Sequence, residues 1–182
     1  GIYFFNFTTP EFNVNVCQLP FWALTTYFCW LSIKTDKILY WILFGTFAAL
    51  GFLSKYLFIF LFISLIMFCI YNFIKFKKFN FKIFITCSIF IVILIPHFLW
   101  LIENNFITIF YGINRSGIET SNFTDQILNP IIFVSKQIVI LLPVFLLFFS
   151  IIKFKKYKIN IKDKKLIFLI FINFTPIIFI LL

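Results

Sequence analysis

The stretch GTFAALGFLSKYLFIFLF, residues 45–62, joins two apolar runs through a very tight turn at Lys55. The runs extend over about 38–54 and 56–74, and helices of this length approach the ~30 Å thickness of a hydrocarbon layer at about 1.5 Å per residue. Both runs are apolar on all sides and lack the period-two alternation of membrane strands. Because backbone hydrogen bonds must be satisfied inside lipid, the stretch predicts two consecutive transmembrane helices.

The same composition continues along all 182 residues. Hydrophobic residues make up 63% of the chain and the mean hydropathy is +1.07, well above the ~45–50% apolar content of a soluble domain. The sequence therefore predicts an all-α fold: a polytopic membrane helix bundle that forms a single transmembrane region over 1–182. Six helices are expected, with one long outer loop at 103–129, and their approximate bounds are 16–32, 38–54, 56–74, 83–102, 130–152 and 166–182.

The two ends of the chain suggest an internal piece of a larger protein, a truncated gene product or a processed chain. The first residue is Gly1, and Leu182 lies inside an apolar run. No basic segment precedes a short apolar core, so a signal peptide is not expected.

Lysine placement predicts the orientation in the membrane. The breaks at 33–37, 75–82 and 153–165 hold 13 of the 16 basic residues. Cytoplasmic loops are enriched in Lys and Arg, so these three breaks are expected in the cytoplasm and the N-terminus and the 103–129 loop outside. The formal net charge of +10 is read in the same way, as orientation and contact with anionic lipid headgroups, and no nucleic-acid partner is expected.

Rare polar residues gather at the expected outer face. The segment PHFLWLIENNFITIFYGINRSGIE, residues 96–119, contains the only histidine and the only arginine of the chain. Polar groups at a membrane rim are costly to desolvate, which indicates a cavity or headgroup site. The residues of this expected substrate mouth are Glu11, Asn13, Asn15, His97, Trp100, Glu103 and Tyr111. A purely interfacial role is the simpler interpretation of Trp100, and a satisfied rim residue that of His97.

Several kinds of site are not indicated. Neither a phosphate-binding loop nor a dinucleotide fingerprint is present. The four cysteines lie in membrane runs without CxxC spacing and are expected to pack as apolar residues. No metal site or other cofactor is evident, although divalent-metal dependence stays open. The loop acids Glu103, Glu119 and Asp125 are interpreted as solvating the loop rather than as hard-cation ligands, which need fixed geometry.

Three segments carry a resemblance to a known family. GTFAALGFLSKYLFIFLF is similar to a helix–turn–helix of the dolichyl-phosphate-mannose-type family-39 glycosyltransferases, which have the GT-C membrane fold. PHFLWLIENNFITIFYGINRSG looks like the segment that follows in bacterial members, and EFNVNVCQLPFWAL resembles the preceding helix entry. The matches come in family order and cover about residues 10–120, while 121–182 match only in being further helices.

The resemblance implies an enzyme that transfers a sugar from a polyprenyl-phosphate carrier to a lipid, glycan or protein acceptor on the outer membrane face. It implies an integral protein of the bacterial inner (plasma) membrane. The family's catalytic acids are expected in an earlier outer loop, so no catalytic residue is assigned in this chain, which is expected to be an incomplete enzyme. The donor phosphate is expected to contact Lys55 and Arg115. Many family members carry Asp at the mouth of the first helix, where this chain has Asn15.

Two other classes stay open at this level. A transporter or lipid flippase would also combine many helices with an outer polar mouth, but would more often place ionisable residues deep in broken helices. Lys136 and Pro143 are the main internal irregularities of that kind. A nonfunctional or regulatory membrane fragment is the third alternative.

Overall fold

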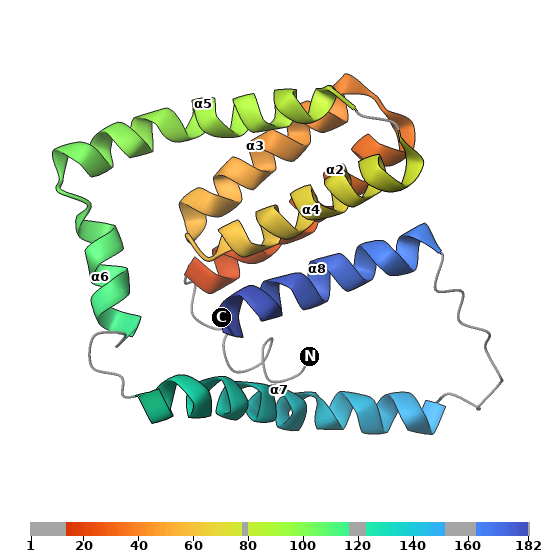
Figure 1. Cartoon of the computed structure of the whole chain (residues 1–182), viewed down its shortest axis with the longest axis vertical. Coiled ribbons are helices and arrows are strands. Elements are labelled where there is room, and N and C mark those ends of the chain that lie inside the picture. The colour runs from red at the N-terminus through yellow and green to blue at the C-terminus, as the bar shows by residue number, and fades with distance from the viewer. Residues whose placement is uncertain (1–13, 78–79, 117–122, 152–162, 182) are drawn as a thin grey trace. The chain divides into compact units, whose positions relative to one another are not determined.

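The structure is a computed structural model that describes residues 14–77, 80–116, 123–151 and 163–181 (Figure 1). Every regular element in these ranges is a helix, which confirms the all-α class and the polytopic membrane bundle. With the labels of Figure 1, the helices are α2 (Val14–Thr35), α3 (Ile38–Ser54), α4 (Phe58–Phe76), α5 (Lys82–Glu103), α6 (Ile107–Ser116), α7 (Phe123–Ile151) and α8 (Lys164–Leu181).

Four of the described segments are long and apolar enough to cross a membrane: Val14–Thr35, Phe58–Phe76, Lys82–Glu103 and Leu128–Ser150. Ile38–Ser54 is a shorter apolar helix of 17 residues. At about 1.5 Å per residue it spans about 25 Å, slightly less than a typical hydrocarbon layer. The expected count of six transmembrane helices stays a prediction.

The segment expected as an outer loop, 103–129, contains helical structure. Helix α6 lies within it, and α7 begins at Phe123, before the expected start at 130. Apolar residues recur along Ile107–Ser116 closely enough to favour a helix, which the polar residues between them obscured in the sequence. The presence of a helix in this segment does not show on which side of the membrane the segment lies.

The chain divides into two compact units, which are described separately. The core unit covers Phe12–Leu99 and Asn160–Leu182, so it contains α2, α3, α4, most of α5 and α8. The α6–α7 unit covers Gly1–Glu11 and Trp100–Ile159, and its described part is the end of α5 with α6 and α7.

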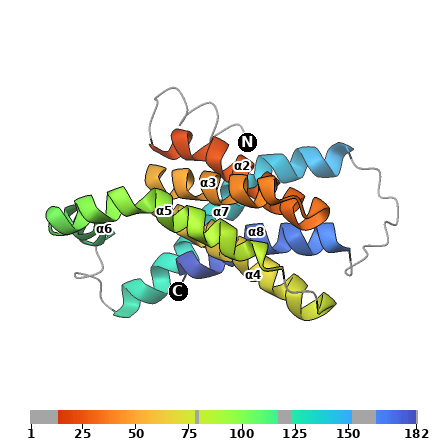
Figure 2. The ribbon, with the colours of Figure 1, turned by 90° about the horizontal axis from the view of Figure 1, so that it is seen from above.

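Helices α2 and α3 run side by side in the core unit, as both views show (Figures 1 and 2). The Phe28 ring of α2 stacks on Phe47 of α3, with ring centroids 5.3 Å apart. Behind this pair, Phe44, Phe58 and Leu65 are completely buried. The unit thus has a packed interior of aromatic and aliphatic side chains, in which dispersion contacts favour helix association in lipid.

Helix α5 meets α3 at a glycine. A Cβ added to Gly45 would lie 2.6 Å from the carbonyl oxygen of Thr86 and 3.1 Å from its Cα. The Thr86 hydroxyl donates a hydrogen bond of 2.8 Å to the backbone oxygen of Trp41. Small residues at membrane helix contacts allow backbones to approach and polar side chains to bond across helices. Gly45 therefore determines how closely these two helices can pack.

Helix α8 returns to the core unit and packs on α4. The Phe168 ring lies 4.8 Å from Phe68 of α4 and 5.1 Å from Trp30 of α2, measured between ring centroids. Further along, Phe179 stacks on Phe60 at 6.1 Å. The start of α8 therefore lies at the end of α4, and the end of α8 lies at its start.

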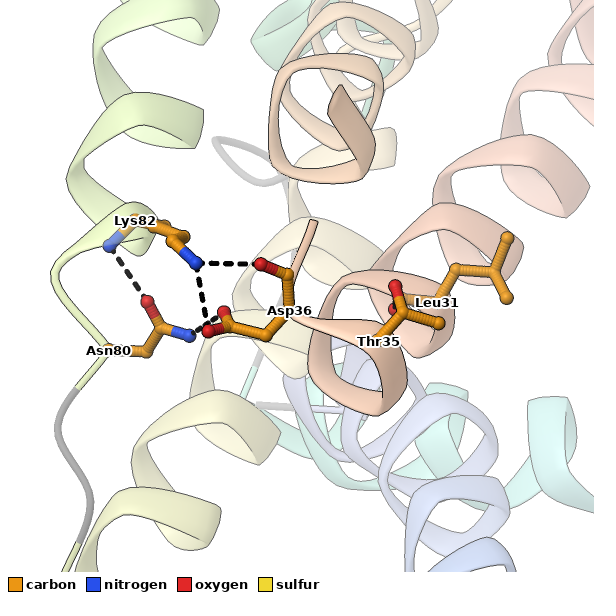
Figure 3. Close-up of polar contacts among 5 residues, drawn as sticks. All are labelled: Leu31, Thr35, Asp36, Asn80 and Lys82. Atoms are coloured by element: carbon orange, nitrogen blue, oxygen red, sulfur yellow. Dashed lines mark hydrogen bonds and ion pairs between the residues drawn. The ribbon is translucent and has the colours of Figure 1, made fainter. Parts of the chain in front are cut away.

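One end of the core unit is joined by a polar network (Figure 3). Asp36, in the α2–α3 connection, forms an ion pair of 2.8 Å with Lys82 Nζ at the start of α5. Lys82 also donates a 2.6 Å hydrogen bond to the backbone oxygen of Asp36, and the Asn80 amide donates to its carboxylate. These bonds favour the ionised carboxylate of Asp36. The hydrogen bond from Lys82, and then that from Asn80, lowers the pKa of the carboxyl. This end also carries Lys34, Lys37, Lys75, Lys77, Lys164 and Lys165.

The α6–α7 unit begins with a sharp break. Asn105 and Phe106 adopt positive φ angles of 50° and 55°, and the Asn104 amide donates a 2.8 Å hydrogen bond to the backbone oxygen of Trp100. This left-handed turn ends α5 and redirects the chain into α6. Helix α7 contains Pro130 and Pro143, and its apolar side chains are exposed where the structure describes them.

Candidate functional site

The α3–α4 turn places two polar side chains at one end of the core unit. Lys55 ends α3 in an extended conformation, with φ −163° and ψ 129°, and its N–H donates a 3.2 Å hydrogen bond to the Gly51 oxygen. The Ser54 hydroxyl donates to the same oxygen at 2.6 Å. Gly51 has no side chain to obstruct the Phe58 ring, whose atoms occupy the place of a Cβ. Gly51 and Ser54 therefore allow the chain to reverse direction within three residues.

Lys55 contacts the first turn of α2. Its Nζ donates a 2.6 Å hydrogen bond to Oδ1 of Asn15, 40 positions earlier in the sequence. A lysine ammonium has three N–H donors, and an amide oxygen neutralises none of its charge. The contact thus fixes the position of a cation and leaves it charged.

Tyr56 joins the same turn to α5. Its hydroxyl lies 2.8 Å from Nε2 of His97, and the two rings have centroids 5.7 Å apart. Either the phenol donates to a neutral imidazole nitrogen, or the imidazole N–H donates to the phenol oxygen. The ring of Tyr56 also packs against Phe52, with centroids 5.3 Å apart. Tyr56 therefore links the turn to α5 both by packing and by a polar contact.

Asn15, Lys55, Tyr56 and His97 are named here the Lys55 cluster. They come from the start of α2, the α3–α4 turn and the last third of α5. Asn15 contacts Lys55 and His97 contacts the adjacent Tyr56, so three residues that the sequence predicted separately, Asn15, Lys55 and His97, belong to or contact the same turn. Tyr56 was missed, although it directly follows Lys55 in the LSKY motif. The position of Tyr56 in the LSKY motif could have indicated it as a site residue. Its residue type could not, because tyrosine is common at membrane boundaries.

The other predicted mouth residues belong to the α6–α7 unit or lie outside the described part of the structure. Trp100 and Tyr111 are 43% and 63% exposed in the α6–α7 unit, and Glu103 is exposed at the end of α5. Arg115 lies in the last turn of α6, and its side chain is outside the described part of the structure. Glu11 and Asn13 also lie outside the described residues.

Within the described residues, no three His, Cys, Asp or Glu side chains gather as the ligands of a metal ion would. Of the loop acids, Glu119 and the side chain of Asp125 lie outside the description. The cysteines that the sequence placed in the apolar packing include two buried ones, Cys29 and Cys69. Metal and cofactor requirements stay predictions.

A comparison with protein-family models matched residues 1–100 to the family described as dolichyl-phosphate-mannose-protein mannosyltransferase. The chain belongs to this family. Comparisons with curated proteins and with solved structures found no match. The family assignment makes this mannosyltransferase-like chain a membrane glycosyltransferase of the GT-C type, and it argues against the transporter and flippase alternatives.

The matched range of the mannosyltransferase family includes the entire Lys55 cluster and ends at Trp100. Glu103, Tyr111 and Arg115 lie beyond it. The resemblance in the sequence extended over about residues 10–120, so the family match supports it up to residue 100 and leaves the Arg115 segment without that support. As an apolar, multi-helix member of a family of membrane enzymes, the chain is an integral membrane protein.

Proposed function

We propose that this glycosyltransferase takes a sugar from a polyprenyl-phosphate donor on the outer face of the bacterial inner membrane, and that Lys55 contacts the donor phosphate. The acceptor is a lipid, glycan or protein. The observation that carries the proposal is the 2.6 Å bond from Lys55 Nζ to Asn15 Oδ1, within the range matched to the family. It holds one cation at a helix end, where a lipid-linked phosphate would lie.

The charge arrangement favours this role for Lys55. One of its three N–H donors is directed to Asn15, so the remaining two can bind phosphate oxygens. A cation near the leaving phosphate stabilises the negative charge that develops on it in the transition state. The apolar helices of the core unit would contact the polyprenyl tail.

The orientation is part of the proposal. The Asp36–Lys82 network and Lys164 lie at the opposite end of the core unit from the Lys55 cluster, since α2, α3 and α4 each run from one end to the other. The excess of lysines at the Asp36 end favours a cytoplasmic location for that end. The Lys55 cluster would then lie on the outer side.

The test is transfer and binding of radiolabelled polyprenyl-phosphate mannose by the complete gene product. We expect Lys55→Ala to lower turnover about 30- to 1,000-fold, or about 2–4 kcal/mol, as for the removal of one oxyanion donor. Asn15→Ala should raise the donor Kd with a smaller effect, because Lys55 keeps its charge but loses its fixed position. Lys34→Ala, an exposed lysine at the other end of α2, is the matched control and should transfer at the parental rate.

Arg115 is the second proposed phosphate contact, and it rests on the resemblance of the YGINRSG segment alone. Arg115→Ala should weaken donor binding, and Arg115→Lys should restore it only in part, because a lysine replaces the planar fork by a point charge. If Lys55→Ala and Arg115→Ala both insert normally and bind and transfer the donor like the parental protein, the phosphate contacts proposed here are wrong.

A further inference from the structure

A cavity of about 970 Å³ lies at the Asp36 end of the core unit, far along the helices from the Lys55 cluster. It is lined by residues at the ends of α2 and α4 and at the starts of α3, α5 and α8. Phe73, Phe76 and Phe81 contribute to an apolar wall, and lysines from three elements contribute to the polar part. The family assignment gives this cavity no role.

The charge of the cavity is positive. Among the described residues that line it are Lys77, Lys82 and Lys164, against one acidic residue, Asp36. Lys82 is paired with that carboxylate at 2.8 Å (Figure 3). Lys164 is half-buried, and its Nζ lies 5.4 Å from the centroid of the Phe76 ring. The cavity therefore offers two further cations beside an apolar surface, an arrangement suited to a group that is both anionic and lipidic.

Two buried polar atoms of the lining lack a hydrogen-bond partner. They are Nε1 of Trp41, which is 2% exposed, and Oδ1 of Asn72, which is 9% exposed. The Trp41 indole is near enough to Asp36 to contribute to the lowered pKa of that carboxyl, but it does not meet the geometry of a hydrogen bond. Buried polar atoms without partners are uncommon in native proteins, so the polar part of this lining is incompletely satisfied.

We propose that this cavity binds the headgroup of an anionic glycerophospholipid. The lipid phosphate would lie between the ammonium groups of Lys77 and Lys164, which act as charged hydrogen-bond donors. The phenylalanines would contact the glycerol and the first methylenes of the acyl chains. Free phosphate would satisfy the cations but would leave this apolar wall unused.

The location agrees with such a ligand. The lining residues lie where the apolar helices end, which is the depth of lipid headgroups in a bilayer. Each Lys or Arg near an anionic membrane surface contributes about 1 kcal/mol to lipid attraction, so two lysines in a shaped cavity give a measurable preference.

The experiment uses the purified full-length protein in mixed micelles with equal amounts of phosphatidylglycerol and phosphatidylcholine. Native mass spectrometry measures which lipid is retained. We expect preferential retention of phosphatidylglycerol, reduced about tenfold or more in Lys77→Gln/Lys164→Gln, as the loss of two such lysines predicts. The matched control is Lys75→Gln/Lys165→Gln, which removes two neighbouring exposed lysines that do not line the cavity. It has the same net charge and should keep the parental preference.

Two further arms identify the source of the phosphate. Inorganic phosphate at millimolar concentration should not displace phosphatidylglycerol, and complete displacement would show a free-anion site instead of a lipid site. Equal loss of retention in the two double variants would show only general charge attraction and would overturn the proposal. Equal retention of both lipids by the parental protein would overturn it as well. Circular dichroism checks that both variants keep the parental helix content.

Discussion

Gly45 and Lys55 belong to the same quoted stretch, yet one serves packing and the other presents a charge. At Gly45 the α3 backbone meets the Thr86 backbone of α5, and at Lys55 the chain leaves α3 with its ammonium bound to Asn15. Gly51 belongs with Gly45, because the Phe58 ring fills the space of its side chain. A motif that resembles a family signature can therefore consist mostly of residues that build the turn, with few that face a substrate.

The packing role of Gly45 predicts a stability effect. Gly45→Ala places a methyl group 2.6 Å from the Thr86 oxygen, so α3 and α5 must separate. Overpacking of this kind costs about 1–3 kcal/mol, which lowers the midpoint of thermal unfolding by about 2–4 °C for each kcal/mol. The midpoint is measured by circular dichroism in detergent.

Gly112→Ala in α6 is the control for this prediction. A Cβ at Gly112 meets no atom within 4 Å, and alanine favours a helix over glycine by up to about 1 kcal/mol. The midpoint should stay unchanged or rise. If Gly45→Ala is as stable as Gly112→Ala, the close α3–α5 contact is not a feature of the folded protein.

The link between the α2–α3 connection and the start of α5 depends on charge. Asp36 is 56% exposed and its partner Lys82 is 34% exposed, so solvent screens the ion pair and its contribution to stability is about 0.2–1 kcal/mol. The hydrogen bond from Lys82, and then that from Asn80, lowers the pKa of Asp36 from its ordinary 3.8. A lowered folded-state pKa means that the contribution is present above pH 3.8 and is lost as the pH falls through the lower folded value.

Asp36→Asn should therefore lower the unfolding midpoint slightly at pH 7. The difference from the parental protein should shrink as the pH falls below 3.8, because the parental carboxyl then becomes protonated too. Salt should reduce the difference at pH 7. Glu103→Gln, at the other end of α5, is the control and should not lower the midpoint, since a carboxylate at a helix C-terminus is unfavourable. A difference independent of pH would mean that the amide itself, and not the loss of the ion pair, changes stability.

At the scale of the whole molecule, the core unit separates its polar groups between two ends. The Lys55 cluster joins α2, the α3–α4 turn and α5 at one end, and Asp36, Lys82 and Lys164 lie at the other. Each end combines cations with apolar helices, but only the Lys55 end contains the predicted donor contact. With the proposed orientation, the proposed transfer site and the proposed lipid cavity would lie on opposite sides of the membrane.

This separation predicts which positions a membrane-impermeant thiol reagent labels in intact cells. In a version of the protein without its four native cysteines, Asn114→Cys should be labelled, whereas Lys78→Cys and Lys158→Cys should be labelled only after the membrane is opened. The reason is the concentration of 13 of the 16 basic residues in the three breaks expected in the cytoplasm. Labelling of positions 78 and 158 but not 114 in intact cells would reverse the topology and place the Lys55 cluster inside.

The sequence by itself determined the membrane class and the helical fold, because uninterrupted apolar runs leave helices as the way to satisfy the backbone in lipid. It also indicated the family, because the order of the motifs along the chain can be recognised without knowing which residues are in contact. It did not predict α6, where short apolar recurrence is mixed with polar residues. Nor did it show that the expected outer loop is partly helical.

Only the tertiary structure decided which polar residues meet. Asn15 and Lys55 are 40 positions apart, Tyr56 and His97 are 41 apart, and Asp36 and Lys82 are joined across 46. Pairing at such separations depends on how helices pack, and packing depends on small local features such as the missing side chain of Gly45. The apolar composition of each helix determines that it is buried in lipid or protein. The contacts between helices determine which charged residues lie at the same end of the core unit.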